Sequence, residues 1–94
     1  MDLQNNNITD EQSVAIFKIL KMKNTIKELT LTGNNITNVQ SIGEFLKTNK
    51  TLHMLSLDHN NIANIQSIGN ALNINNTLKY LDLNNNNITD VQSI

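Results

Sequence analysis

One eight-residue pattern returns four times and limits what this chain can fold into more than any other feature. The four copies are MDLQNNNI at residues 1–8, LTLTGNNI at 29–36, LSLDHNNI at 55–62 and LDLNNNNI at 81–88. The last three copies begin 26 residues apart, whereas the first two begin 28 apart. A fixed period of about 20–50 residues is typical of stacked structural repeats. The sequence therefore predicts a repeat array that spans the whole chain.

The array is expected to form one domain. Its predicted units are residues 1–28, 29–54, 55–80 and a partial unit at 81–94. The apolar residues that precede the second copy lie 26 residues before those that precede the third copy, as far back as Ile16. The two additional residues of the first unit therefore fall between Ile8 and Ile16, where they would lengthen a loop or the start of a helix without shifting the strands.

Each copy of the pattern reads as a strand followed by a turn. Apolar residues alternate at Leu29 and Leu31, as they do in a strand with one buried face. The asparagine of each copy (Asn6, Asn34, Asn60, Asn86) follows the strand where the chain turns inward. An inward amide carries donors and an acceptor for backbone groups that the turn leaves without partners. These asparagines are therefore predicted to be structural.

The second half of each unit indicates a helix. Val39, Ile42 and Leu46 are spaced as one apolar helical face, and Ile65, Ile68 and Leu72 repeat it. Thr followed three residues later by Gln at 9–12, 37–40 and 89–92 fits the capping box at a helix start. Ala63 stands at the corresponding position of the third unit, so that helix is expected to lose about 1 kcal/mol of capping.

With its L-x-L-x-x-N-x-I cores, the chain resembles the leucine-rich repeat family. The stretches SIGEFL at 41–46 and SIGNAL at 67–72, with N-x-T-L at 49–52 and 75–78, resemble its ribonuclease-inhibitor-like subclass, although 26 residues is short for it. The resemblance implies an α/β fold, a leucine-rich repeat solenoid or horseshoe segment. Its parallel β-sheet would form the concave face, and short helices would form the convex face.

Residues that alternate with the buried leucines are expected to face outward from the sheet, and they vary while the core repeats. Variation on a constant scaffold is how repeat proteins build recognition surfaces. The predicted partner-binding residues are Glu28, Thr30, Thr32, Met54, Ser56, Asp58, His59, Tyr80, Asp82 and Asn84. Met54 and Tyr80 form the large apolar pair among them. The predicted function is a protein–protein interaction scaffold that binds a protein or peptide; the alternative is a structural spacer in a larger protein.

Composition narrows the classes of partner and chemistry. The net charge is −1, all seven cations are lysines and cysteine is absent. No nucleic-acid partner is expected without a basic balance, and no cofactor or metal site is expected. Asp58, His59 and Asp82 are predicted to lie near one another, but no nucleophile or phosphate loop accompanies them. The chain is therefore not expected to be an enzyme.

The last expectations concern the ends of the chain and its cellular compartment. The last helix would be cut short near Val91 and Ile94, which predicts a fragment of a longer protein and end-to-end self-association. No signal peptide or membrane-length apolar segment is visible, so no membrane partner is expected. A chain without cysteine fits a reducing compartment, and the predicted location is cytoplasmic.

Overall fold

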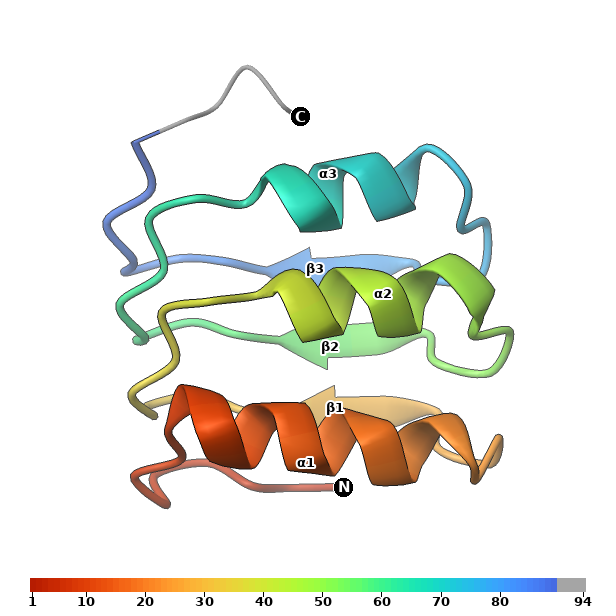
Figure 1. Ribbon diagram of the computed structural model, residues 1–94, viewed down its shortest axis with the longest axis horizontal. Coiled ribbons are helices and arrows are strands. Elements are labelled where there is room, and N and C mark those ends of the chain that lie inside the picture. Colours follow the sequence, from red (N-terminus) through yellow and green to blue (C-terminus); the bar gives the residue numbers. More distant parts are fainter. Residues whose placement is uncertain (90–94) are drawn as a thin grey trace.

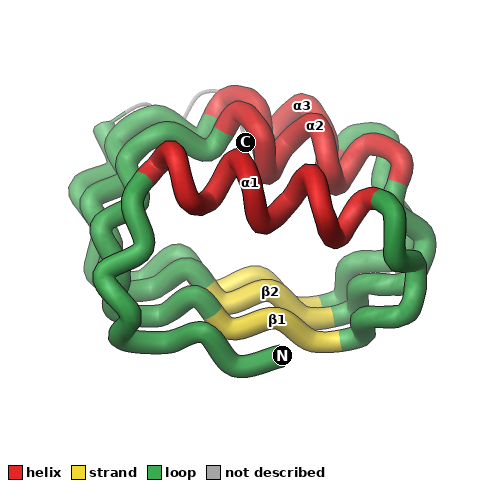
Figure 2. The backbone as a smooth tube through the Cα atoms, turned by 60° about the horizontal axis from the view of Figure 1, so that its bottom comes forward, coloured by secondary structure: helices red, strands yellow, loops and turns green. Residues whose placement is uncertain are grey.

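Helices and strands alternate along the chain and separate into two layers. The structure is a computed structural model, and it describes residues 1–89. In chain order the elements are α1 (Asp10–Lys21), β1 (Glu28–Thr30), α2 (Gln40–Thr48), β2 (Met54–Ser56), α3 (Gln66–Leu72) and β3 (Tyr80–Asp82). The three helices stack side by side in one layer and the strands form the other (Figures 1 and 2). The chain is an α/β leucine-rich-repeat-like segment in its architecture.

The sheet is parallel, and its register reproduces the period of the sequence. The strand order is β1-β2-β3, and Leu29 lies opposite Leu55, which lies opposite Leu81. Asp2 forms a single parallel bridge with Thr30, so the first copy of the pattern lies beside β1. Each crossover returns through a helix, as parallel strands require. The 26-residue step therefore places equivalent residues of successive units side by side.

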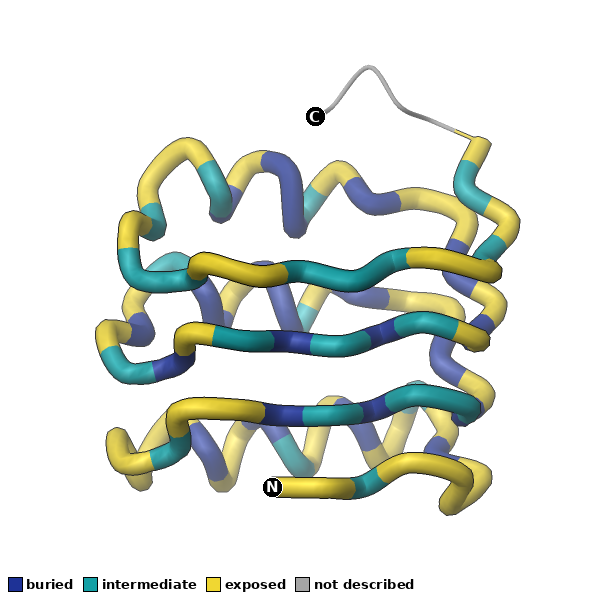
Figure 3. Tube along the Cα trace, turned by 180° about the vertical axis from the view of Figure 1, so that it is seen from behind, coloured by how far each residue is buried: buried dark blue, intermediate teal, exposed yellow. Residues whose placement is uncertain are grey.

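The core lies between the two layers. Leu29, Leu31, Leu55 and Leu57 are 0% exposed, and along β1 and β2 the buried positions alternate with half-buried or exposed ones (Figure 3). From the helix layer, Ile42 and Leu46 are equally buried, and Phe17 meets Phe45 edge to face with ring centroids 5.2 Å apart. The period-two and helical patterns thus meet in one continuous apolar cluster.

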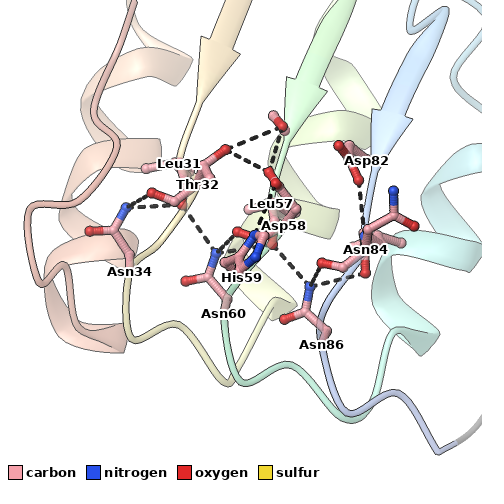
Figure 4. Close-up of polar contacts among 12 residues, drawn as sticks. Leu31, Thr32, Asn34, Leu57, Asp58, His59, Asn60, Asp82, Asn84 and Asn86 are labelled. Atoms are coloured by element: carbon pink, nitrogen blue, oxygen red, sulfur yellow. Dashed lines mark hydrogen bonds and ion pairs between the residues drawn. The ribbon is translucent and has the colours of Figure 1, made fainter.

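The predicted inward orientation is confirmed for Asn34, Asn60 and Asn86, whose side chains form a ladder that closes the turns after the strands. It is wrong for Asn6, which is exposed and donates to the Gln4 carbonyl oxygen, because no preceding unit lies beside it within residues 1–89. The Nδ2 of Asn60 donates to the carbonyl oxygens of Leu57 in its own unit (2.9 Å) and Leu31 in the preceding unit (3.1 Å). Asn34 and Asn86 make the corresponding pairs of bonds. Figure 4 shows the three asparagines side by side. Each amide therefore joins two units while it satisfies buried carbonyl groups.

Two further asparagines, at the opposite edge, also bind backbone groups that have no partner in the sheet. This role was not predicted from the sequence. Asn49 Oδ1 accepts from the backbone N–H groups of Thr51 (3.0 Å) and Leu52 (2.7 Å). Asn75 repeats this arrangement, and its Nδ2 donates to the Leu46 carbonyl oxygen of the preceding unit at 2.7 Å. The 26-residue spacing of these two asparagines was the available signal.

The predicted start of the second helix is wrong, because Thr37 binds a neighbouring unit instead of capping α2. The backbone N–H (2.8 Å) and the hydroxyl of Thr37 both donate to the Asp10 carboxylate. The α2 helix starts three residues later, at Gln40, without a side-chain cap. The α3 helix starts at the equivalent residue, Gln66, and it also has no side-chain cap. Ala63 therefore does not leave α3 less well capped than α2. Residues 89–92, the third predicted box, extend outside the described residues.

The first helix begins earlier in its unit than α2 does, and it includes the two additional residues. Thr9 and Gln12 form the predicted capping box, and α1 begins two residues after Ile8. The α2 helix begins four residues after the equivalent Ile36. The additional residues of the first unit therefore belong to the helix, which has 12 residues where α2 has nine and α3 has seven.

Candidate functional site

The open face of the sheet, which points away from the helices, carries all ten predicted binding residues. They form three columns that cross the strands: Glu28, Met54 and Tyr80; Thr30, Ser56 and Asp82; and Thr32, Asp58 and Asn84, with His59 following Asp58. We call these ten residues the sheet face. Side chains alternate across a strand, so the burial of the leucines turns these residues outward.

Met54 and Tyr80 are neighbours in the first column. Their Cα atoms are partners in the β2–β3 register, and the Tyr80 side chain is 55% exposed while Met54 is half-buried. Glu28 completes the column and is exposed. An exposed aromatic side chain beside a partly exposed thioether offers apolar area on a face whose other eight residues are polar or charged. This column is the apolar part of the sheet face.

Asp58 organises the polar part. Its Oδ1 accepts hydrogen bonds from the hydroxyl of Thr32 on the preceding unit (2.6 Å) and from the hydroxyl of Ser56 (2.9 Å) (Figure 4). Its Oδ2 lies 3.2 Å from Nδ1 of His59. The Thr32 hydrogen bond has the largest effect and, with those of Ser56 and His59, outweighs desolvation, so the pKa of Asp58 is lowered. Asp58 is a fixed negative charge.

These contacts favour recognition over catalysis. The hydroxyls of Thr32 and Ser56 donate to the Asp58 carboxylate, whose pKa is lowered, and a carboxylate of lowered pKa is a weak general base. Asp82 accepts from the backbone N–H of Asn84 at 2.9 Å. Within residues 1–89 no group of three His, Cys, Asp or Glu side chains is placed to hold a metal ion. The arrangement presents charge and hydrogen-bonding groups.

Backbone conformation accounts for a fourth column at the end of the strands. Asn5, Gly33, His59 and Asn85 all have positive φ, at 58°, 69°, 56° and 58°. Glycine and asparagine tolerate this left-handed region better than most residues, which explains their recurrence here. His59 is the departure from that pattern, and its conformation directs the imidazole toward Asp58. The repeated Gly/Asn position was the sequence signal for this turn.

Grooves are present in the helix layer, on the side of the molecule opposite the predicted binding surface. Among residues 1–89, two open cavities lie in grooves between neighbouring helices, one of about 450 Å³ between α2 and α3 and one of about 380 Å³ between α1 and α2. Amide side chains such as Asn38, Gln40 and Gln66 dominate the larger one. No helix in the described part of the chain is long and apolar enough to cross a membrane.

Comparison with known proteins agrees with this architecture. A family model described as Leucine Rich repeat matches residues 23–39 and 75–91, and these stretches begin two 26-residue steps apart. Each stretch contains a loop, a strand and the asparagine turn that follows it. No curated protein matches the chain. Leucine-rich repeats are generally protein-interaction modules and typically non-enzymatic binding scaffolds. The two matches support a leucine-rich repeat family, and the parallel sheet with its layer of helices is consistent with an α/β leucine-rich repeat segment.

Proposed function

We propose that the sheet face binds an extended segment of a protein partner, with Tyr80 and Met54 as the apolar anchor. The observation that carries this proposal is the contrast between a constant core and a variable face. The leucines and asparagines repeat in every unit, whereas the first column changes from Glu28 to Met54 to Tyr80. Tyr is favoured at binding hot spots because it buries a large area at little rotamer cost.

The charges of the sheet face favour a cationic partner segment. Glu28, Asp58 and Asp82 are its carboxylates, and no lysine is among its ten residues. Asp58 is held in its anionic form by the hydroxyls of Thr32 and Ser56. A Lys or Arg that follows an apolar side chain in the partner would therefore meet a negative surface beyond Met54 and Tyr80. Such complementarity favours orientation and rate of association more than affinity.

The size of the face predicts weak binding by these units alone. Strands lie about 4.8 Å apart, and residues along one face cover roughly 13 Å of a strand, so the described face measures a few hundred Å². A standard interface buries about 800 Å² on each partner. We therefore expect micromolar or weaker binding to this segment, unless other repeats contribute to the same surface.

Selection from a displayed peptide library tests the proposal. Binders selected on the purified chain are expected to combine an apolar residue with Lys or Arg, and Tyr80→Ala should weaken them by about 1–2 kcal/mol in calorimetry. The matched control is Ile19→Ala on α1, since Ile19 (57% exposed) is as exposed as Tyr80. Lys47→Ala is a second helix-side control. Equal losses in Tyr80→Ala and the controls would place recognition away from the sheet face.

A structural spacer is the second candidate, and the Asp58 cluster favours it. Thr32, Ser56 and Asp58 satisfy one another across two units, so part of the polar face strengthens the stack without a partner. A spacer predicts that no selected peptide depends on Tyr80. The same peptide measurements therefore separate the two functions.

We also propose that the units belong to one domain of the ribonuclease-inhibitor-like subclass. The buried residues of positions 1–89 form one core cluster, which supports a single domain with units at 1–28, 29–54, 55–80 and 81–94. A helix between each strand and the next supports the subclass. Deletion of residues 55–80 tests the repeat boundaries: a shortened chain that still unfolds cooperatively would support them, and loss of folding would oppose them.

A further inference from the structure

All seven lysines lie on one edge of the molecule, although the chain has a net charge of −1. Lys18 and Lys21 are in the last turn of α1, and Lys47 is in the last turn of α2. The others, Lys23, Lys27, Lys50 and Lys79, are in the loops that lead from helices to strands. We call this set the basic edge; it is the right-hand edge in Figure 1.

The acidic residues are concentrated at the opposite edge. Asp10 and Glu11 begin α1, and Asp58 and Asp82 lie at or just beyond the ends of their strands. Of the remaining described acids, Asp2 bridges to the last residue of β1, Glu44 lies in the middle of α2, and Glu28 begins β1. Glu28 directly follows Lys27 and Glu44 pairs with Lys47, so these two acids lie near the lysines, while most of the described acids lie toward the opposite edge.

Helix dipoles account for only part of this separation. Cations near helix C-termini are favourable, which explains Lys18, Lys21 and Lys47. Lys23 and Lys50 follow α1 and α2 by two residues, whereas Lys27 and Lys79 lie six or more residues beyond the preceding helix, where the dipole does not explain them. Within residues 1–89, Lys47 is the one lysine in an ion pair, 3.8 Å from Glu44. The positive charge of the loops is therefore not neutralised by the described part of the chain.

Two of the loop lysines, Lys27 and Lys79, are also aligned, with His53 between them. The backbone N–H of His53 donates to the Lys27 carbonyl oxygen (2.8 Å), and that of Lys79 donates to the His53 carbonyl oxygen (2.8 Å). These three residues are consequently neighbours across successive units, and all three are exposed. Lys50 belongs to the loop between α2 and β2 and is exposed too.

Exposed apolar side chains accompany the lysines. Met22, between Lys21 and Lys23, is 83% exposed, and Ile74, in the loop before β3, is 57% exposed. Neither described cavity opens at these loops, since the residues lining them include only Lys47 from the basic edge. The edge therefore presents lysines beside exposed apolar tips.

We infer that the basic edge docks on the surface of an anionic lipid bilayer, with Met22 and Ile74 entering the headgroup region. Clustered lysines are attracted to anionic lipid, and apolar side chains add partition energy. A nucleic-acid partner is disfavoured because the chain has no Arg and its single Tyr lies on the sheet face. No membrane partner was expected because the chain has no membrane-spanning segment. Peripheral contact with a bilayer surface does not require such a segment.

Vesicle co-sedimentation of the full chain tests this inference. Phosphatidylcholine vesicles with and without phosphatidylserine are the probes, at low and at raised salt. The key variant replaces Lys23, Lys50 and Lys79 with Gln. The matched control, Asn35→Asp with Asn61→Asp and Asn87→Asp, changes the net charge by the same amount at three exposed asparagines of the opposite edge. Comparing unfolding curves establishes that both variants remain folded.

The inference requires binding that depends on phosphatidylserine and weakens with salt. Each lysine near an anionic surface contributes about fivefold, so the lysine variant should lose about a hundredfold in binding. The asparagine variant should lose much less, and Met22→Gln should reduce binding at high salt. Absence of vesicle binding, or equal losses in the two charge variants, would overturn the inference. Tighter binding of a polyglutamate peptide or single-stranded RNA through the same lysines would also overturn it.

Discussion

The backbone N–H of Ile36 donates a hydrogen bond to Oδ1 of Asn60, 3.0 Å away and 24 residues later in the chain. The same amide donates from Nδ2 to the carbonyl oxygens of Leu31 and Leu57. One side chain therefore joins the turn of one unit to the strand of the next, and Asn60 itself is 5% exposed. Removing it leaves buried backbone groups without partners.

The first prediction concerns this residue. Asn60→Ala should lower the free energy of unfolding by about 1–3 kcal/mol for each orphaned group. Asn61→Ala is the matched control, because Asn61 is exposed and its side chain makes no hydrogen bond among residues 1–89. Asn5→Ala is a poorer control, since positive φ at Asn5 makes alanine there costly. Equal denaturation midpoints for the position-60 and position-61 variants would contradict the ladder.

The second prediction is a reversal of ordinary helix propensity. Replacing a helical Gly with Ala usually stabilises by about 1 kcal/mol. At Gly43, however, a Cβ would lie 2.6 Å from the backbone oxygen of Ser67 on α3. Overpacking of this kind costs about 1–3 kcal/mol, so Gly43→Ala should destabilise the chain. Thermal unfolding measures this, with Asn70→Ala on the exposed side of α3 as control. A Gly43→Ala variant more stable than the natural chain would contradict this prediction, because α2 and α3 would then move apart at little cost in free energy.

The third prediction concerns acid stability. Because the folded-state pKa of Asp58 is lowered, its contribution is present above the unfolded-state pKa of about 4 and is lost as the pH falls through the folded value. Thr32→Val removes the strongest cause of that shift and should cost about 1 kcal/mol at neutral pH. The difference from the natural chain should shrink below about pH 4. Urea unfolding at several pH values measures these free energies. For Thr30→Val, on the same face, the difference in unfolding free energy from the natural chain should not shrink at low pH.

The repeat pattern was sufficient to predict the strands, their register and the inward asparagines Asn34, Asn60 and Asn86, but not the exposed Asn6 of the first copy. Each of these depends on residues that recur every 26 positions, so one unit predicts its neighbours. Leu29, Leu55 and Leu81 are paired as their spacing requires. The apolar faces of the helices were predictable for the same reason. The binding role of the sheet face stays a prediction, because no partner contacts accompany it.

Other features depend on contacts that the local pattern does not contain. Thr37 has the sequence of a helix cap, but Asp10 of the preceding unit receives its hydrogen bonds, and α2 begins later. Desolvation is the largest effect on Asp10, yet the hydrogen bonds from Thr37 and Asn38 outweigh it, so its pKa is lowered. Such competition between units appears only when the two loops are placed side by side.

The fourth prediction is end-to-end association. Leu81 and Leu83 of the described edge are half-buried, whereas the equivalent Leu55 and Leu57 are 0% exposed. A second copy that added its first unit beside β3 would cover this apolar surface, and further copies could repeat this head-to-tail contact. Sedimentation velocity should therefore show a mass that increases with concentration. A constant monomer mass at all concentrations would rule out this contact, and Tyr80→Ala should not alter the result.

The last prediction separates charge from apolar contact on the sheet face. For a selected peptide that carries Lys or Arg, Asp82→Asn should weaken binding by about 0.5–1 kcal/mol at low salt, since a partly exposed pair contributes no more than that. The loss should fall mainly on the association rate and disappear at high salt, because rim charges steer encounter. Tyr80→Ala should instead raise the dissociation rate at every salt concentration. Glu11→Gln on α1 changes the charge equally and serves as the control. If Glu11→Gln and Asp82→Asn slow association to the same extent, then the overall charge of the chain attracts the peptide, and the carboxylates of the sheet face do not select it.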